Sequence, residues 1–216
     1  MCAQRNRRRP GEPLSRDRIL ATAEQLIERD GSRALSMRKL ADELGIAPTT
    51  IYWHVGNQDA LLQGLVERFA AELAVPAAEG DTPKARLVSI ADRLRAGLLS
   101  RPRLLELLLS DGRLIELYLP ARDLTLRELR AAGLPDAEAV RAVRALLICI
   151  SGFVWSEVRL DQVRRREEAS APDTSYLGLP VPAELLEHAE QFDMDELFDF
   201  TVTRFVTGVL AEAAGA

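Results

Sequence analysis

Residue types that build metal sites and covalent crosslinks are scarce in this sequence. Its 216 residues include two cysteines, Cys2 and Cys149, and two histidines, His54 and His188. Neither cysteine belongs to a CxxC pair, and the histidines do not have the spacing of a zinc site. We therefore expect no disulfide framework, no metal site and no cofactor.

Long apolar runs are also missing. The longest run without charge or obvious turn residues, 145–155, holds eleven residues, whereas a membrane-spanning helix needs about 20. The arginine-rich first residues are not followed by the apolar run of a secretory signal. Hydrophobic residues nevertheless make up 47% of the chain, which is too many for general disorder. These features predict a soluble, cytoplasmic, globular protein that does not contact membranes.

The motifs of common enzyme sites are absent from the sequence. It contains no GxSxG, HExxH, phosphate-binding P-loop or GxGxxG pattern. The adjacent acids Glu167 and Glu168 stand in a charged helix end and not in a cleft pattern. We therefore expect a protein that is not an enzyme, and a saturable rate in an activity screen would contradict this expectation.

Charge is distributed unevenly along the chain. Residues 1–50 hold ten basic and seven acidic side chains, a net charge of +3, and the other 166 residues carry −8, which gives the total of −5. A basic end on an acidic body indicates that this end meets a polyanion such as nucleic acid. The alternative at this point is a solvated charged face with a disordered tail.

Apolar residues recur at helical spacing almost throughout, and no segment alternates with period two long enough to form a strand. Ser15, Ser36, Asn57 and Asp193 are the residue types that cap helix N-termini. An all-α fold is predicted, with an arginine-rich disordered arm over 1–14 and a proline-rich loop over 169–182. The expected helices span 15–30, 36–44, 47–54, 57–74, 84–99, 101–110, 113–132, 137–166 and 193–212.

The segment 36–55, SMRKLADELGIAPTTIYWHV, has the pattern of a helix-turn-helix. Ala41 is small enough for two helices to cross closely, and Gly45 takes the left-handed backbone of the tight turn without strain. In this motif the second helix enters the DNA major groove. The alternative is an ordinary corner between two helices. The residues expected to pin the helices together are Leu40, Leu44, Ile46 and Ile51.

Residues 15–65 resemble the DNA-binding domain of the tetracycline-repressor (TetR) family, and YWHV followed by Asn57 and residues 60–62 is especially similar to the tetracycline-repressor branch. The resemblance implies a homodimer that represses transcription and is released from a palindromic operator by a small ligand. It also implies a three-helix DNA-binding domain over 15–62 and a larger helical ligand-binding and dimerisation domain over 63–214.

The resemblance assigns Arg38 to a guanine edge, which its planar guanidinium suits, although a phosphate or solvent contact stays open. Tyr52 either contacts DNA or packs half-buried, His54 either faces DNA or is packed, and Trp53 is expected in the core. Pro48 replaces a Gln that reads a base in close relatives, which suggests a different operator. Gln58 replaces their Lys, which argues against a charge-based contact there. The residues expected to contact DNA are Ser36, Arg38, Lys39, Pro48, Thr49, Thr50, Tyr52, His54 and Gln58.

The N-terminal arginines and the last long helices leave alternatives open. Residues 5–9 either enter a minor groove, follow phosphates or form a solubilising tail. The helices 137–166 and 193–212 carry enough apolar surface for a four-helix dimer interface, as the resemblance implies, or for an intramolecular core. The residues in question are Leu146, Leu147, Ile150, Phe153, Phe205 and Val209.

The ligand chamber is expected within the long apolar C-terminal body. Ile90 and Leu108 stand where the tetracycline-binding branch has an Asn and a magnesium-ligating His, so we expect a more apolar ligand than tetracycline–magnesium. The loop 169–182 is expected to cover the entrance.

Two functions compete with a ligand-controlled repressor. One is a ligand-independent architectural or activating DNA binder, and the other is a helical adaptor. The ligand chamber is the feature that separates the first of them from a repressor. The candidate wall residues, each of which is otherwise core, are Ile90, Leu94, Leu108, Phe153, Trp155 and Ser156.

Overall fold

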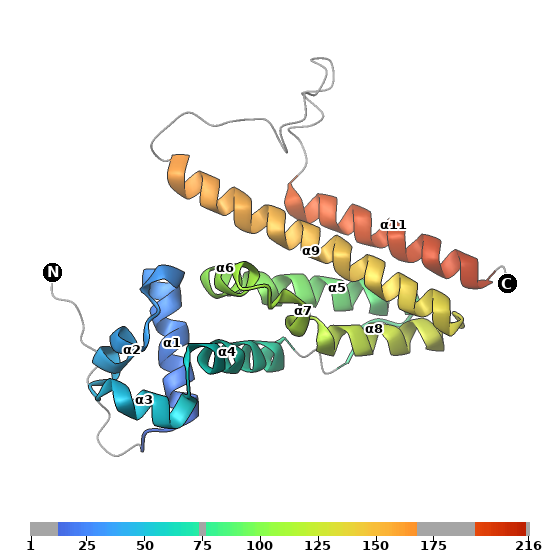
Figure 1. Ribbon diagram of the computed structural model, residues 1–216. Helices are drawn as coiled ribbons and strands as arrows, with labels where there is room; N and C mark the ends of the chain where they lie inside the picture. Colours follow the sequence, from blue (N-terminus) through green and yellow to red (C-terminus); the bar gives the residue numbers. More distant parts are fainter. Residues whose placement is uncertain (1–12, 74–76, 168–192, 215–216) are drawn as a thin grey trace. The chain divides into compact units, whose positions relative to one another are not determined.

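The computed structural model describes residues 13–73, 77–167 and 193–214, and all regular structure within them is helical (Figure 1). The predicted all-α class is therefore confirmed. The arm up to residue 12 and the predicted loop 169–182 lie outside the described residues. The helices are α1 (Arg16–Asp30), the 3-10 turn η1 (Ser32–Ala34), α2 (Met37–Leu44), α3 (Pro48–Val55), α4 (Gln58–Glu72), α5 (Pro83–Leu99), α6 (Pro102–Ser110), α7 (Leu114–Leu117), α8 (Leu119–Ala131), α9 (Asp136–Glu167) and α11 (Met194–Ala214).

Side-chain caps begin the helices where the sequence predicts them. The Ser15 hydroxyl accepts a hydrogen bond from the Arg18 backbone N–H at 3.2 Å. The Asn57 side chain accepts one from the Ala60 N–H at 2.8 Å, and Asp193 caps α11 in the same way, at 2.8 Å. Each cap satisfies a backbone donor that has no partner inside its own helix.

One predicted helix is divided in two. The apolar spacing predicts a single helix over 113–132, but α7 ends at Leu117 and α8 begins at Leu119, with Tyr118 between them. Pro120 stands in the first turn of α8. A proline cannot donate to the carbonyl four residues earlier, so a continuous helix is interrupted here.

The first compact unit of the chain extends to Val66. Within it α1 packs against α2 and α3, and α2 packs against α3. Helices this short are marginal in water on their own, so their stability comes from the shared apolar core. The largest fully buried side chains of that core are Ile19, Leu20, Leu26, Ile27, Leu40, Ile51, Leu61 and Leu65.

The second unit begins at Glu67, so the division falls inside α4. Here α5 packs against α8, α9 and α11, and α9 also packs against α8 and α11. The 32 residues of α9 extend over about 48 Å at 1.5 Å per residue. None of the described helices combines the length and the hydropathy that a membrane span requires.

Candidate functional site

The turn between α2 and α3 has the geometry of a helix-turn-helix. Gly45 ends α2 in the left-handed region, with φ 67° and ψ 38°. A Cβ atom at this position would meet nothing within 4 Å, so the glycine serves the backbone conformation and not a close contact. The next N–H, that of Ile46, donates to the Ala41 carbonyl at 3.0 Å. The chain thus turns within three residues, and α3 packs against α2.

Burial of one face of α3 leaves the rest of this short helix exposed. Pro48 starts it, at a position where its missing N–H costs nothing. Ile51 and Val55 face the core together with the fully buried Ala41 of α2, as the predicted close crossing requires. The exposed side chains of α3 are Pro48, Thr49, Tyr52, Trp53 and His54, and Thr50 is half-buried.

Trp53 was expected in the core, and this expectation is wrong. Its side chain is 89% exposed. Successive residues are turned by about 100° around a helix, so Trp53 lies nearly opposite both Ile51 and Val55. Those two smaller residues occupy the core, and the indole is an additional member of the exposed surface of α3. The helical spacing from Ile51 would have indicated this position.

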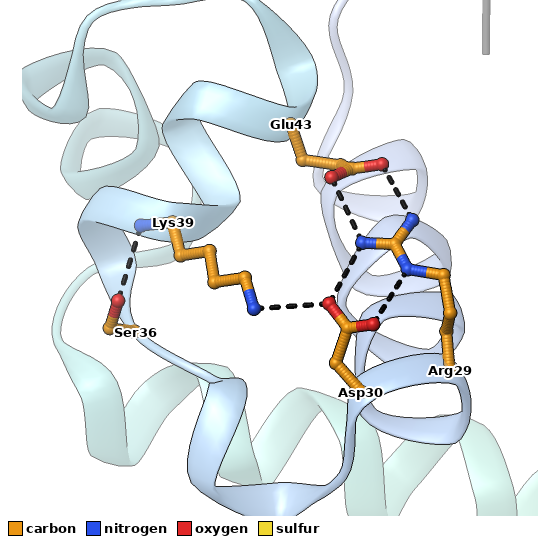
Figure 2. Close-up of polar contacts among 5 residues, drawn as sticks. All are labelled: Arg29, Asp30, Ser36, Lys39 and Glu43. Carbon is orange, nitrogen blue, oxygen red and sulfur yellow. Dashed lines mark hydrogen bonds and ion pairs between the residues drawn. The ribbon is translucent and has the colours of Figure 1, made fainter. Parts of the chain in front are cut away.

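Arg38 and Lys39 are both exposed on α2, but their surroundings differ. Among the described residues the Arg38 guanidinium forms no ion pair. The Lys39 ammonium donates to the Asp30 carboxylate at 3.0 Å, and Arg29 donates to both Asp30 and Glu43 (Figure 2). Hydrogen bonds from Arg29 and then from Lys39 hold the pKa of Asp30 well below its usual range. Lys39, which the sequence analysis assigns to DNA, is therefore paired with Asp30 in this structure.

Two further predicted residues stand at helix N-termini. The Ser36 hydroxyl accepts a hydrogen bond from the Lys39 backbone N–H at 3.1 Å and so caps α2. Gln58 is exposed in the first turn of α4, where backbone N–H groups favour an anion. The first unit thus presents the N-terminal turns of α2, α3 and α4 together with the exposed side chains of α3.

The predicted wall residues have different surroundings in the second unit. Ile90, Leu94 and Leu108 are fully buried in the core of the second unit. The half-buried ring of Phe153 meets Phe198 edge-on at 5.2 Å. Ser156 turns back on its own helix and donates to the Gly152 carbonyl at 2.8 Å.

A hollow of about 220 Å³ lies between α6 and α9. Of the predicted wall residues, it includes only Trp155, whose indole is 55% exposed. The hollow combines apolar surface with one acidic and one basic side chain, a combination that the sequence pattern did not indicate. Its lining residues are Glu106, Leu109, Ser110, Trp155, Val158 and Arg159.

A buried polar pair also escaped the sequence reasoning. The Tyr118 hydroxyl lies 2.9 Å from the Ser151 hydroxyl, inside the second unit. Burial raises the pKa of Tyr118 above its ordinary value. A phenol whose ring is buried needs such a partner, and the break between α7 and α8 is what places it opposite α9.

The second half of α4 is fastened to the end of α5 and the start of α6. Arg101 contacts the Glu72 carboxylate at 2.5 Å, and its guanidinium lies 5.7 Å from the centre of the Phe69 ring. A Cβ atom on Gly97 would come within 2.6 Å of the Leu73 side chain. Glycine therefore allows α5 to approach the end of α4 closely.

An apolar face remains exposed on α9 and α11. Ile148 is 69% exposed, and Val140, Trp155 and Phe200 are each about half exposed. Of the residues considered for a dimer interface, Leu146 and Ile150 are buried within the unit, because they lie on the side of α9 that meets its neighbours. The half-buried ones are Leu147, Phe153, Phe205 and Val209.

Two family sequence profiles match this chain. The profile described as "Bacterial regulatory proteins, tetR family" matches residues 19–65, and the one described as "Tetracyclin repressor-like, C-terminal domain" matches residues 75–213. The first covers the helix-turn-helix and the second covers nearly all of the second unit. Together they leave residues 1–18, 66–74 and 214–216 outside the matches.

Two curated relatives have similar sequences. An HTH-type transcriptional regulator of Saccharopolyspora erythraea is 30% identical over 155 residues, which cover 72% of this chain and 64% of that protein. The HTH-type transcriptional repressor DrrR1 of Streptomyces coeruleorubidus is 29% identical over 182 residues, 83% of this chain and 66% of that protein. The chain thus spans slightly less than two thirds of the length of these relatives.

A solved structure has the same fold over almost the whole chain. Apo ActR from Streptomyces coelicolor superimposes with a TM-score of 0.71 at 28% identity, covering 95% of this chain and 99% of that one. ActR in complex with actinorhodin gives a TM-score of 0.71 at 26% identity, covering 94% and 98%. The likeness includes the N-terminal helix-turn-helix and the helical C-terminal part.

Proposed function

Because this chain belongs to the TetR family of bacterial regulatory proteins, we propose that it is a transcriptional repressor that binds DNA and is controlled by a small molecule. Members of this family are DNA-binding regulators and not enzymes. A cytoplasmic location is part of the proposal, since the partner is DNA.

The observation that carries the proposal is the exposed surface of α2 and α3. Arg38 is available for a bidentate contact with a guanine, worth about 1–3 kcal/mol of discrimination. Thr49 and Tyr52 offer hydroxyls for phosphates or base edges. The exposed Trp53 adds an apolar contact of the kind that a thymine methyl accepts. In this assignment α3 enters the major groove, and Ser36, Thr50, His54 and Gln58 approach the backbone or neighbouring bases.

The protein acts as a homodimer on a near-palindromic operator. One helix-turn-helix makes few base contacts, and two copies read half-sites about 34 Å apart. The exposed apolar face around Ile148 and Phe200 supports this assembly. Gly152 and Gly208 lie on the same two faces with open space above them. An exposed glycine weakens a helix by about 1 kcal/mol, and the close approach of a partner helix explains its presence.

The effector is a small, largely apolar molecule. The second unit is rich in apolar side chains, and the buried Ile90 and Leu108 offer no ligand for a magnesium chelate. The hollow beside Trp155 is a candidate entrance, with the indole available for stacking and Glu106 and Arg159 available for polar groups. ActR, which is in complex with actinorhodin in a solved structure, supports control by a small molecule.

Control of DNA binding passes through α4. This helix contributes to both units, and Arg101 fastens its second half beside the start of α6. The same α6 carries Glu106 and Ser110, which line the hollow. A ligand that moves α6 therefore acts on α4. It shifts the equilibrium only by its differential affinity for the two states, typically about 1–3 kcal/mol.

The proposal is tested by selecting duplexes from random DNA with the purified protein and then adding candidate effectors. Actinorhodin and tetracycline with magnesium serve as the first two probes, followed by a panel of flat apolar compounds. We expect a near-palindromic duplex to be selected, and tetracycline with magnesium to leave it bound. A protein that selects no duplex at moderate salt contradicts DNA binding. A selected duplex that no compound releases favours the architectural or activating alternative.

A further inference from the structure

Four charged side chains join the end of α1 to α2, and we refer to them as the α1–α2 clamp (Figure 2). Arg29 donates to Glu43 at 2.9 and 3.1 Å and to Asp30 at 3.0 Å through each of two nitrogens. Lys39 donates to Asp30 at 3.0 Å. Two residues at the C-terminal end of α1 therefore hold two residues of α2.

The spacing of the two clamp residues on α2 lets the clamp fix the position of this helix. Lys39 and Glu43 are four residues apart, so they lie one turn apart on the same flank of the helix. Attachment at two heights opposes both sliding of α2 along α1 and rotation about its own axis. This matters because α2 has only eight residues and cannot keep its orientation without tertiary contacts.

The clamp carries no net charge. Hydrogen bonding to Arg29 lowers the pKa of Glu43, as Arg29 and Lys39 do for Asp30, so both carboxylates are ionised at neutral pH. Two positive and two negative side chains then balance. A lysine whose charge is matched in this way adds little to the release of counterions from DNA, which depends on phosphates neutralised by the protein.

Arg38 is the neighbour of the clamp residue Lys39 on α2. It precedes Lys39 and lies about 100° around the helix from it, on a different flank. A rotation of α2 that released Lys39 from Asp30 would swing the Arg38 side chain away from its position. A bidentate base contact needs a defined direction of the guanidinium plane, so specificity depends on the rotation of α2.

We propose that Lys39 is a positioning residue for DNA recognition, not a phosphate contact: the α1–α2 clamp uses it to set the orientation of Arg38. The proposal rests on the proposed DNA-binding function and replaces the role that the sequence resemblance implies for Lys39. Glu43 acts in the same way from one turn further along α2.

The experiment measures two quantities for the full chain: the ratio of specific to scrambled DNA affinity, and the slope of affinity against salt concentration. Affinities are measured for a duplex selected by the wild type and for a scrambled duplex of equal composition, between 50 and 200 mM salt. The variants are Lys39→Met and Glu43→Gln. Lys84→Met is the matched control, because Lys39 and Lys84 are the two lysines of the sequence and Lys84 is exposed in the second unit.

We expect Lys39→Met and Glu43→Gln each to lower the ratio of specific to scrambled affinity about threefold, the scale of an exposed ion pair. The salt slope of Lys39→Met should equal that of Lys84→Met, and Lys39→Arg should restore the ratio. Glu43→Gln is informative because removing a negative charge by itself strengthens DNA binding. Thermal unfolding confirms that each variant is folded.

A salt slope for Lys39→Met that is shallower than that of Lys84→Met by about 0.9 would identify a phosphate contact and overturn the proposal. An unchanged affinity ratio in Glu43→Gln would also overturn it. A wild type that selects no duplex contradicts the proposed function instead, so the two failures are distinguishable.

Discussion

The two units contain the same device in different surroundings: an arginine that holds two carboxylates. In the first unit the side chain of Arg29 is 53% exposed and joins α1 to α2. In the second unit the side chain of Arg95 is 11% exposed and joins α5 to Glu157 of α9 and Asp195 of α11, at 2.7 and 2.6 Å. Arg95 also lies 4.7 Å from the centre of the Phe198 ring.

The difference shows how solvent decides what an ion pair does. Water screens an exposed pair, which typically contributes less than about 1 kcal/mol, so Arg29 orients α2 without adding much stability. A pair removed from water leaves an uncompensated charge if one partner is lost. Arg95 is therefore required for the stability of the second unit, whereas Arg29 mainly sets the orientation of α2 in the first unit.

The largest expected effect is the loss of Arg95. Arg95→Met leaves Glu157 half-enclosed without its cation and removes the stacking on Phe198. We expect the free energy of unfolding to fall by about 3 kcal/mol, measured by urea denaturation. Arg29→Met is the matched control and should lower the free energy of unfolding much less, because water screens the exposed ion pairs of Arg29. Equal losses in the two variants would remove the contrast between the two devices.

A second comparison concerns two exposed surfaces. The exposed surface of α3 carries both polar and apolar side chains, whereas the exposed face of α9 and α11 is apolar. Ile148→Glu places a charge on the apolar face and should weaken dimerisation at least about thirtyfold, because burying an unpaired charge is costly. Analytical ultracentrifugation over a concentration series measures the effect. Ile115→Glu changes an isoleucine that is 74% exposed on α7 and should leave the dimer intact. A dimer that withstands Ile148→Glu must use another surface.

In the first unit the sharpest test is Arg38→Ala. We expect its affinity for the selected duplex to fall at least about tenfold at fixed salt, with scrambled DNA much less affected. Arg33→Ala, which removes an exposed arginine from η1, is the control for charge alone. Equal losses for both duplexes would show that Arg38 contacts phosphates and does not read bases.

The smallest expected effect concerns Asp92, on α5. Partial desolvation by neighbouring residues, and then the nearby charge of Asp199, raise the pKa of Asp92 above its usual value. Its folded-state pKa therefore exceeds the unfolded one, so the ionised carboxylate destabilises the fold and the wild type recovers stability as the pH falls. Asp92→Asn should stabilise the protein at pH 7 by less than about 0.5 kcal/mol, because Asp92 is exposed to screening.

The advantage of Asp92→Asn should disappear below about pH 3.9, where the carboxyl is protonated in both states. Thermal unfolding at pH 7 and at low pH measures it. Asp81→Asn, which removes a carboxylate from the segment before α5, is the control. A gain that persists at low pH would indicate a packing effect and not a charge effect.

Local features of the fold were predictable from the sequence. The caps at Ser15, Ser36, Asn57 and Asp193 lie within three residues of the donors that they satisfy. The left-handed turn at Gly45 depends on the backbone of one residue. The division between α7 and α8 is also local, because Pro120 interrupts the helix, but the apolar spacing over 113–132 predicts one helix.

The composition of each exposed surface was less predictable. Trp53 was expected in the core, but on the buried side of α3 the core is filled by Ile51 and Val55. Leu146 and Ile148 are equally apolar and two residues apart, yet one is buried and the other exposed. A single helix does not reveal which of its sides meets a neighbour when both are apolar.

The amino-acid order by itself determined the helices, their caps, the α2–α3 turn and the residue types offered to DNA, since these depend on interactions among near neighbours in the chain. Only the tertiary structure decided that Lys39 is held by Asp30, that Trp53 faces outward and that Ile148 is left uncovered. Those outcomes depend on which helices share a core and on how much water each charge retains.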